Sequence, residues 1–256
     1  MDLKINGKRA LVMGASRGLG RAVAEGLLAE GVEVIAVSRN ADAIRDWAKD
    51  MPHLTAMAAD LSDLASVDAL IEAVLVKGGV DILVNNSGGP APGTAATTAR
   101  ADWLVQFEAM AANLFHLTGR LLPGMKERKW GRVITIASSG VEQPIPNLAL
   151  SNGIRAAVVG WSKTLAAEVA ADGVTVNIVM PGRIQTTRVA ELDAAAAIRT
   201  SSTVEAVQRA SAAAIPAGRY GRPAEFAAMV VFLASEPASY VTGSRMRVDG
   251  GAIRSI

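Results

Sequence analysis

Residues 9–20 have the sequence RALVMGASRGLG, and they decide the fold of this 256-residue chain. The run at 9–13 is apolar and strand-like, and an alanine-rich helical pattern follows at 19–30. Glycines at the spacing G-x-x-x-G-x-G allow a tight turn and a close approach to a pyrophosphate, which the start of the helix would face with free amide groups. The pattern predicts a dinucleotide site, with an ordinary strand–helix turn as the plainer alternative. The site residues predicted in this turn are Gly14, Ser16, Arg17, Gly18, Leu19 and Gly20.

The rest of the chain continues the alternation of strands and helices. Strand-like runs lie at 9–13, 32–37, 54–58, 80–84, 132–137, 174–180 and 245–248. Helical patterns lie at 19–30, 41–50, 63–77, 101–127, 152–171 and 223–235. The alternation predicts one α/β domain over 1–256, a Rossmann fold with a doubly wound, seven-stranded parallel sheet and helices on both faces. The Ala- and Ser-rich segment 187–215 is weakly periodic and predicts an irregular helical lid.

Composition excludes several other classes of function. The chain has no cysteine, and its only histidines, His53 and His116, are too far apart for a local metal cluster, so no metal site is expected. The net charge is +2 without a Lys/Arg run, which argues against a nucleic-acid partner. No apolar run approaches the roughly 18 residues of a membrane span, and the first residues do not resemble a signal peptide. We therefore expect a cytoplasmic protein with a small-molecule substrate.

The end of the second predicted strand indicates which dinucleotide is bound. NAD-binding units carry an acidic residue about 20 positions after the glycines, where it holds the ribose hydroxyls. This chain instead has Ser38 and Arg39 there. A hydroxyl and a guanidinium suit a 2′-phosphate, and Arg17 could reach the same group. We expect NADP(H) rather than NAD(H), the alternative being that both arginines are only solvated surface charges.

Further motifs together resemble the short-chain dehydrogenase/reductase family, close to its β-ketoacyl-ACP reductase type, over almost the whole chain. They are ADL at 59–61, NNSGG at 85–89, GRVI at 131–134, TVN at 175–177, PG at 181–182, GRPAE at 221–225, VTG at 241–243 and VDGG at 248–251. The resemblance implies that Asp60 and Leu61 bind the adenine, and that Asn86 and Gly88 lie along the adenosine ribose. The positions implied at the nicotinamide end are Pro181, Gly182, Ile184 and Thr186.

The same resemblance implies an altered catalytic centre. The family uses a serine, a tyrosine, a lysine four residues later and an asparagine in the preceding long helix. Ser138 stands at the serine position, but Ser151 and Arg155 stand where the tyrosine and lysine belong, and Met110 replaces the asparagine. Arginine stays protonated, so it cannot act as a tuned lysine, although its fork could bind the ribose hydroxyls. Asn113 lies one helical turn further on and is not assigned a role.

Three functions remain open at this point. The first is NADPH-linked reduction of a carbonyl, 3-oxoacyl-like, in which Ser138 binds the substrate oxygen and the proton comes from a non-standard source. Candidates for that source are Ser151 through water and Glu142, with Arg155 as an electrostatic stabiliser. The serines could equally cap backbone groups, and Glu142 could be an exposed loop carboxylate. The other functions are an NADP(H)-binding sensor or non-catalytic subunit, and a non-redox enzyme that reuses the pocket.

Apolar residues on several faces of the predicted helices at 101–127 and 152–171 bear on assembly. The family resemblance implies a homo-oligomer, a tetramer or a dimer, built through these helices. Packing on the sheet is the plainer account of the same residues. The remaining tyrosines, Tyr220 and Tyr240, fall outside the expected catalytic segments and are not expected to act.

Overall fold

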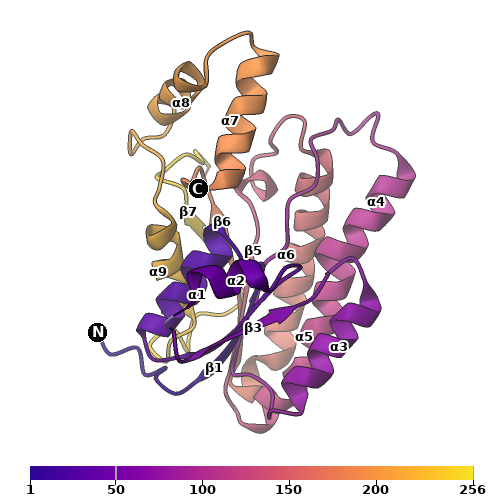
Figure 1. Cartoon of the computed structure of the whole chain (residues 1–256), viewed down its shortest axis with the longest axis vertical. Coiled ribbons are helices and arrows are strands. Elements are labelled where there is room, and N and C mark those ends of the chain that lie inside the picture. Colours follow the sequence, from indigo (N-terminus) through magenta and orange to yellow (C-terminus); the bar gives the residue numbers. More distant parts are fainter. Residues whose placement is uncertain (50, 256) are drawn as a thin grey trace.

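The computed structural model describes residues 1–49 and 51–255 and has the predicted α/β architecture (Figure 1). Its seven strands are all parallel and follow the order β3-β2-β1-β4-β5-β6-β7. The predicted doubly wound sheet is therefore confirmed. The strands are β1 (Arg9–Met13), β2 (Glu33–Ser38), β3 (Leu54–Ala58), β4 (Ile82–Asn85), β5 (Gly131–Ile136), β6 (Val174–Pro181) and β7 (Arg245–Val248).

Helices cover both faces of the sheet. Figure 1 shows α1, α2 and α9 on one side and α3, α4, α5 and α6 on the other, while α7 and α8 project together from one end. No helix of the described residues has the length and apolar character needed to cross a membrane. The helices are α1 (Gly18–Ala29), α2 (Asp42–Trp47), α3 (Leu64–Leu75), α4 (Arg100–Phe107), α5 (Asn113–Glu127), α6 (Ala149–Val169), α7 (Thr187–Arg199), α8 (Val204–Ala213) and α9 (Pro223–Leu233).

The strands divide their side chains between two apolar cores, because successive strand residues point to opposite faces. In β1, Ala10 and Val12 join the core beneath α1 and α9, whereas Leu11 and Met13 join the core beneath α3, α5 and α6. Both faces of the central strands are thus buried, as expected of a parallel sheet.

The strand register shows where a ligand-binding crevice can form. In β1 and β2, Arg9 lies opposite Glu33 and Met13 opposite Val37. In β1 and β4, Ala10 lies opposite Ile82 and Val12 opposite Val84. The carboxyl ends of these strands therefore lie level. The chain order reverses between β1 and β4, and ligands of open α/β sheets bind in the crevice at such a switch point.

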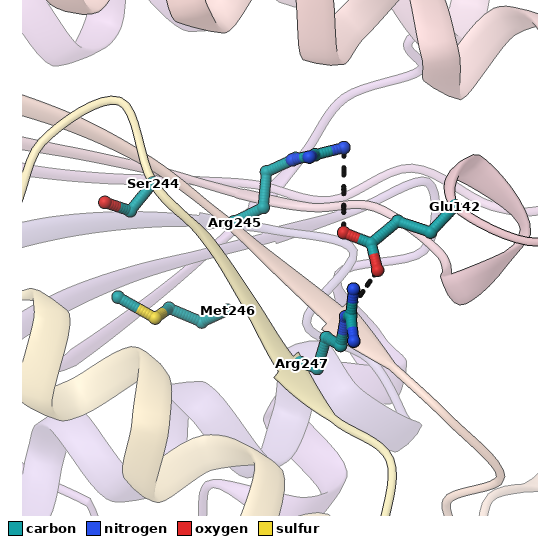
Figure 2. Close-up of a pocket in the computed structure, with 5 residues that line it drawn as sticks. All are labelled: Glu142, Ser244, Arg245, Met246 and Arg247. Carbon is teal, nitrogen blue, oxygen red and sulfur yellow. Dashed lines mark ion pairs between the residues drawn. The ribbon is translucent and has the colours of Figure 1, made fainter. Parts of the chain in front are cut away.

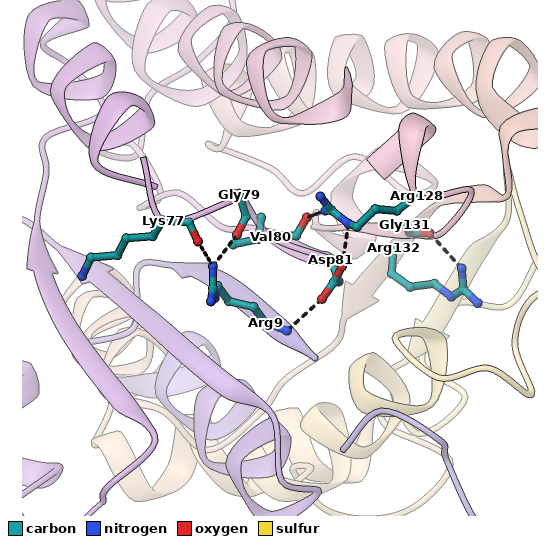
Figure 3. Close-up of polar contacts among 8 residues, drawn as sticks. All are labelled: Arg9, Lys77, Gly79, Val80, Asp81, Arg128, Gly131 and Arg132. Carbon is teal, nitrogen blue, oxygen red and sulfur yellow. Dashed lines mark hydrogen bonds and ion pairs between the residues drawn. The ribbon is translucent and has the colours of Figure 1, made fainter. Parts of the chain in front are cut away.

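Polar contacts connect the segments at the amino ends of β1 and β4, opposite the carboxyl ends of the strands (Figure 3). The Asp81 carboxylate accepts from the Arg9 backbone N–H at 3.1 Å and pairs with Arg128 at 3.1 Å. Arg128 also donates to the Val80 carbonyl at 2.7 Å, and the Arg9 side chain donates to the Gly79 carbonyl at 3.3 Å. These contacts hold the amino ends of β1 and β4 in place. The carboxyl ends of the same strands lie on the other side, where the ligand is expected.

Three predicted elements differ in detail. The helix expected at 41–50 ends at Trp47, and residue 50 lies outside the described residues. The helix expected at 101–127 contains a π-helical turn at Glu108–Ala112 between α4 and α5. The segment 187–215 is not irregular, since it contains the regular helices α7 and α8. Thr186 and Thr203 cap them by accepting from backbone N–H groups, and the abundant alanines, which give a helix little polar contrast, explain the weak periodicity.

Candidate functional site

The glycine turn between β1 and α1 is too crowded for side chains. Gly14 and Gly18 have φ of 65° and 60°. A Cβ on Gly20 would lie 2.2 Å from the Gly14 carbonyl oxygen, and one on Gly14 would lie 2.5 Å from the Asn86 amide nitrogen. Arg17 is the N-cap of α1 and makes no side-chain cap, so the first amide groups of the helix are left for another acceptor. This cradle fits a pyrophosphate.

The end of β4 supports the turn. The Asn86 amide group donates to the carbonyls of Met13 at 3.2 Å and Gly14 at 3.4 Å. The buried Asn85 donates to the Thr118 hydroxyl at 3.0 Å. These contacts hold the loop after β4 against the glycine turn. Gly88 is exposed, and a Cβ there would meet open space.

The residues expected to bind the adenosine lie at the ends of β2 and β3. Arg39 is exposed, and the Ser38 hydroxyl donates to the Asn40 carbonyl at 2.6 Å. The Ser62 backbone N–H and hydroxyl, with a smaller effect of the Arg39 charge, hold the pKa of Asp60 below its usual range. Asp60 is thus an ionised acceptor beside an exposed cation, and Leu61 packs against the core beneath α3.

The nicotinamide end predicted from the family motif follows β6. A Cβ on Gly182 would lie 2.6 Å from the Asp249 Cα, which explains a glycine there. Ile184 is buried, and Pro181 ends β6. Thr186 starts α7 and lies beside the glycine turn, since a Cβ on Gly18 would be 3.6 Å from its methyl group.

Arg17 faces α7 in this structure. It pairs with Glu191 of that helix at 3.3 Å, and both side chains are largely exposed. The ion pair joins the glycine turn to the segment 187–215. Reaching a 2′-phosphate, as the sequence suggested for Arg17, would require this exposed pair to open, and such pairs contribute little free energy.

The Ser138 hydroxyl has both a capping contact and a free proton. Ser138 follows β5, and its Oγ accepts from the Gly140 backbone N–H at 3.1 Å. Ser138 therefore makes a capping contact, and its role at a substrate stays a prediction. A hydroxyl can accept and donate at once, so this contact orients Oγ and leaves its proton for a substrate oxygen.

Arg155 comes from the first turns of α6 and reaches the carboxyl edge of the sheet. It donates to the Ile136 carbonyl at 2.9 Å and to the Ser87 carbonyl at 3.5 Å, thereby joining the ends of β5 and β4. Burial, with a smaller effect of Arg188, lowers the pKa of Arg155 to about 10, so the guanidinium is charged at neutral pH. Ser151 is half-buried one turn earlier, and the described residues offer no hydrogen-bond partner to its hydroxyl. The capping alternative therefore gains no support at Ser151.

The structure also places Met110, which stands at the asparagine position of the family, and the nearby Asn113. Met110 lies in the π-helical turn and is buried against Leu150 and Ile154 of α6. Asn113 is also buried, and it donates to the Leu61 carbonyl at 2.8 Å, on the adenosine side. Asn113 therefore braces the loop after β3.

Glu142 is not the exposed loop carboxylate that the sequence suggested. Its side chain is only 8% exposed and pairs with Arg245 at 3.6 Å and with Arg247, both from β7 (Figure 2). These ion pairs engage the Glu142 carboxylate with β7. Neither tyrosine takes the place of the family's catalytic tyrosine in this structure. Tyr240 is fully exposed, and the Tyr220 hydroxyl donates to Asp193 at 3.0 Å.

Two further groups beside the site have contacts that the sequence did not predict. Asp193 of α7 is completely buried and binds Arg183 and Tyr220, which anchors α7 to the segments after β6 and before α9. Arg188 of α7 donates to the Pro90 carbonyl at 3.0 Å, in the loop after β4. An aspartate on the buried side of an alanine-rich helix was a usable signal for the first group, whereas the contact of Arg188 depends on how α7 is placed.

The crevice, its glycine cradle and the level strand ends define an α/β dinucleotide-binding protein. The family model described as Enoyl-(Acyl carrier protein) reductase matches residues 14–252. The chain therefore belongs to the short-chain dehydrogenase/reductase family, as the motifs predicted. The predicted loss of the Tyr–Lys pair stays a prediction.

Curated relatives match along nearly the whole chain. The 3-oxoacyl-(acyl-carrier-protein) reductase FabG of Vibrio cholerae is 36% identical over 255 residues, covering 97% of this chain and 98% of the relative. The protein of the same name from Escherichia coli is 38% identical over 257 residues, with the same coverage. A putative ketoacyl reductase of Streptomyces coelicolor is 36% identical over 250 residues, covering 94% of this chain and 95% of the relative.

Solved structures agree with the fold. The L-sorbose reductase of Gluconobacter frateurii, complexed with NADPH and L-sorbose, superposes with a TM-score of 0.94 at 33% identity and full coverage of both chains. A variant of the actinorhodin polyketide ketoreductase with NADPH has a TM-score of 0.92 at 32% identity, covering 97% of this chain and 98% of that one.

Proposed function

We propose that this protein is an NADPH-dependent oxidoreductase that reduces a small, 3-oxoacyl-like carbonyl substrate at a non-standard catalytic site. The observation that carries the proposal is the glycine cradle at the β1–β4 switch point, where a Cβ on Gly20 would lie 2.2 Å from the Gly14 carbonyl. The NADPH-bound neighbours and the exposed Arg39 support NADP(H) over NAD(H). The residues proposed to hold the nucleotide are those of the turn, Ser38, Arg39, Asp60, Leu61, Asn86, Gly88, Arg155, Pro181, Gly182, Ile184 and Thr186.

Bound NADPH would supply the hydride. The Ser138 hydroxyl would hydrogen-bond the substrate carbonyl oxygen and keep its own proton, because the Gly140 N–H already orients its oxygen. Arg155 supplies a fixed positive charge that stabilises the developing alkoxide. A water held by the Ser151 hydroxyl would transfer the one proton to the alkoxide oxygen, and the hydroxide left behind would be reprotonated from solvent, since a serine itself is too weak an acid at neutral pH.

A second function is favoured by a specific observation. Met110 is buried among apolar side chains, Glu142 is paired with arginines, and Tyr220 is bonded to Asp193. A protein with an intact nucleotide cradle and so few proton donors would suit an NADP(H) sensor or a non-catalytic subunit. This alternative predicts binding without turnover.

Titration of the purified protein with NADPH and NADH, followed by energy transfer from its tryptophans, tests the cofactor. Saturation at micromolar NADPH with at least tenfold weaker NADH is expected. A panel of 3-oxo and 2-oxo compounds then tests turnover through the loss of NADPH absorbance. Selective binding without any oxidation would favour the sensor, and no binding of either nucleotide would contradict both functions.

We also propose that the protein acts in the cytoplasm as a homo-oligomer, a dimer or a tetramer. The plainer packing account holds for Met110, Leu114 and Leu117, which are buried, but Leu104 and Phe107 are 53% and 40% exposed. No residue of the described helix α4 is buried. A second copy covering this surface would remove that apolar area from water.

A further inference from the structure

Two guanidinium groups meet at the loop after β4. Arg155 approaches from α6 and donates to the Ser87 carbonyl at 3.5 Å, while Arg188 approaches from α7 and donates to the Pro90 carbonyl at 3.0 Å. The two acceptors are three residues apart. Arg188 also lies over Gly89, because a Cβ there would be 3.6 Å from its Nη2. The short loop at 87–90 is therefore contacted by one guanidinium group from α6 and by another from α7.

The positive charge at this place is not balanced. Arg155 forms no ion pair with any carboxylate of the described residues. Arg188 has a carboxylate neighbour in Glu191, but at 3.7 Å, and Glu191 is shared with Arg17. Arg183, the other arginine of this region, is neutralised by the buried Asp193. Backbone carbonyls accept from both guanidinium groups, but they do not cancel the charge, and an anionic ligand would supply the opposite charge.

The two cations lie close enough to affect each other electrostatically. Arg188 contributes to the lowered pKa of Arg155, after the larger effect of burial. Like charges in a poorly solvated place repel each other, and an anion between them would reverse that cost. The arrangement therefore favours an anion over a neutral ligand.

The nucleotide does not require these two groups for its phosphates. The glycine cradle and the first amides of α1 suit the pyrophosphate, and Arg39 lies at the position for a 2′-phosphate. Arg155 and Arg188 instead face the loop at 87–90, on the side of α7 and of Ser138. A planar carboxylate matches the fork of a guanidinium.

We propose that Arg155 and Arg188 form a subsite for a carboxylate of the substrate, so that the carbonyl substrate is a short oxo acid. The inference rests on the proposed reductase function and names its substrate class. The carbonyl would lie at Ser138 and the carboxylate under α7, between the two guanidinium groups. An uncharged ketone or ester would leave Arg155 without a carboxylate and Arg188 with only the exposed, shared Glu191 at 3.7 Å.

Calorimetric titration of acetoacetate and of methyl acetoacetate into the NADP⁺-saturated protein tests the subsite, because NADP⁺ has no hydride to give and the ketone is not consumed. The same two ligands are titrated into the protein without nucleotide, and pyruvate with methyl pyruvate forms a second pair. The variants are Arg188→Gln and, as a control, Arg199→Gln, which removes the same charge from the exposed end of the same helix. NADPH oxidation is measured in parallel.

The expected result is that at least one acid binds tenfold or more tightly than its ester. Arg188→Gln should reduce the ratio below twofold with NADP⁺ affinity changed less than threefold, and Arg199→Gln should retain it. Equal binding of acid and ester would overturn the proposal. So would a parallel tenfold loss of NADP⁺ affinity in Arg188→Gln, which would assign Arg188 to the nucleotide.

The reductase proposal can fail separately. Preferential acid binding that depends on Arg188, but without NADPH oxidation, would support the subsite and contradict the reductase. Oxidation of NADPH at equal kcat/KM with the acids and the esters would support the reductase and overturn the subsite.

Discussion

Gly20 shows how one backbone contact determines the cofactor cradle. The distance of 2.2 Å between its hypothetical Cβ and the Gly14 carbonyl is far below van der Waals contact, and both atoms belong to short, well-packed segments. A side chain at Gly20 must therefore move either α1 or the turn. This requirement is stronger than the general preference of turns for glycine.

The first prediction is that Gly20→Ala weakens NADPH binding at least tenfold, because displacement of the turn misplaces the amide groups that receive the pyrophosphate. The matched control is Gly119→Ala, an exposed position on α5 where a Cβ meets open space. That control should be neutral or stabilise the protein by up to about 1 kcal/mol. Fluorescence titration and thermal unfolding measure both variants, and equal NADPH affinities would contradict the account.

Arg39 carries the expected choice between dinucleotides. An acidic side chain at this position accepts from the 2′-hydroxyl of NAD and repels a 2′-phosphate. Arg39→Asp should therefore weaken NADPH binding at least tenfold and leave NADH binding unchanged or stronger. The control Arg45→Asp makes the same charge change at an exposed α2 position. An unchanged NADPH:NADH affinity ratio in Arg39→Asp would show that Arg39 is only a solvated surface charge.

Individual residues also show where sequence reasoning ends. The position of Ser138 after a strand was predictable, because the strand and its motif are local. The partners of Glu142 and Asn113 were not, since they come from β7 and from the loop after β3, distant in sequence. Side-chain chemistry at a loop depends on which distant element faces it.

At the scale of elements, α7 depends on a single buried carboxylate. Asp193 is 0% exposed and binds both Arg183 and the Tyr220 hydroxyl. Asp193→Ala would remove the acceptor of the part-buried Tyr220 hydroxyl, at a cost of about 0.5–1.5 kcal/mol, while the partly exposed Arg183 can turn to water. Hydrogen exchange across 187–199 should accelerate.

The control for that prediction is Glu191→Ala on the same helix. Its ion pairs with Arg17 and Arg188 are exposed and should contribute about 0–1 kcal/mol. If Glu191→Ala accelerated exchange in α7 as much as Asp193→Ala, the exposed contacts rather than Asp193 would hold the helix.

The start of α9 gives a prediction for pH. Arg219, followed by the Arg222 backbone N–H, lowers the pKa of Glu225 from 4.5 to about 2. Since the folded-state pKa is depressed, the stabilisation is complete above pH 4.5 and is lost as the pH falls toward 2. Glu225→Gln should therefore lower the urea midpoint at pH 7, with a smaller difference at pH 3. Glu205→Gln, in the first turn of α8, is the control, and a difference independent of pH would contradict this assignment.

Element boundaries were predictable where periodicity is strong and not where packing decides. The strands were located within two residues, because apolar runs bounded by polar residues mark them clearly. The π-helical turn at Glu108–Ala112 was not predicted, since it leaves the apolar pattern continuous. It places Met110 against α6, which no local pattern encodes.

For the whole molecule, the alternation of strands and helices determined the fold, because few arrangements bury both faces of a parallel sheet. The glycine turn and the strand ends of the proposed nucleotide site followed from the same pattern, since they are local features. The catalytic half did not, because Arg155 acquires its partners only when α6, β4 and β5 pack together.

The last prediction concerns assembly, where one copy leaves apolar surface exposed. Leu104 and Val105 of α4 are 53% and 54% exposed. Burial of a large aliphatic side chain contributes about 1.5–3 kcal/mol, so a second copy that covers both would gain substantially from this surface. Light scattering at micromolar concentration should give the mass of a dimer or tetramer. The double change Leu104→Glu and Val105→Glu should lower that mass, whereas Ile198→Glu, at an 83% exposed position on α7, should not. A monomeric native protein would exclude the homo-oligomer, and an unchanged mass in the double variant would move the interface away from α4.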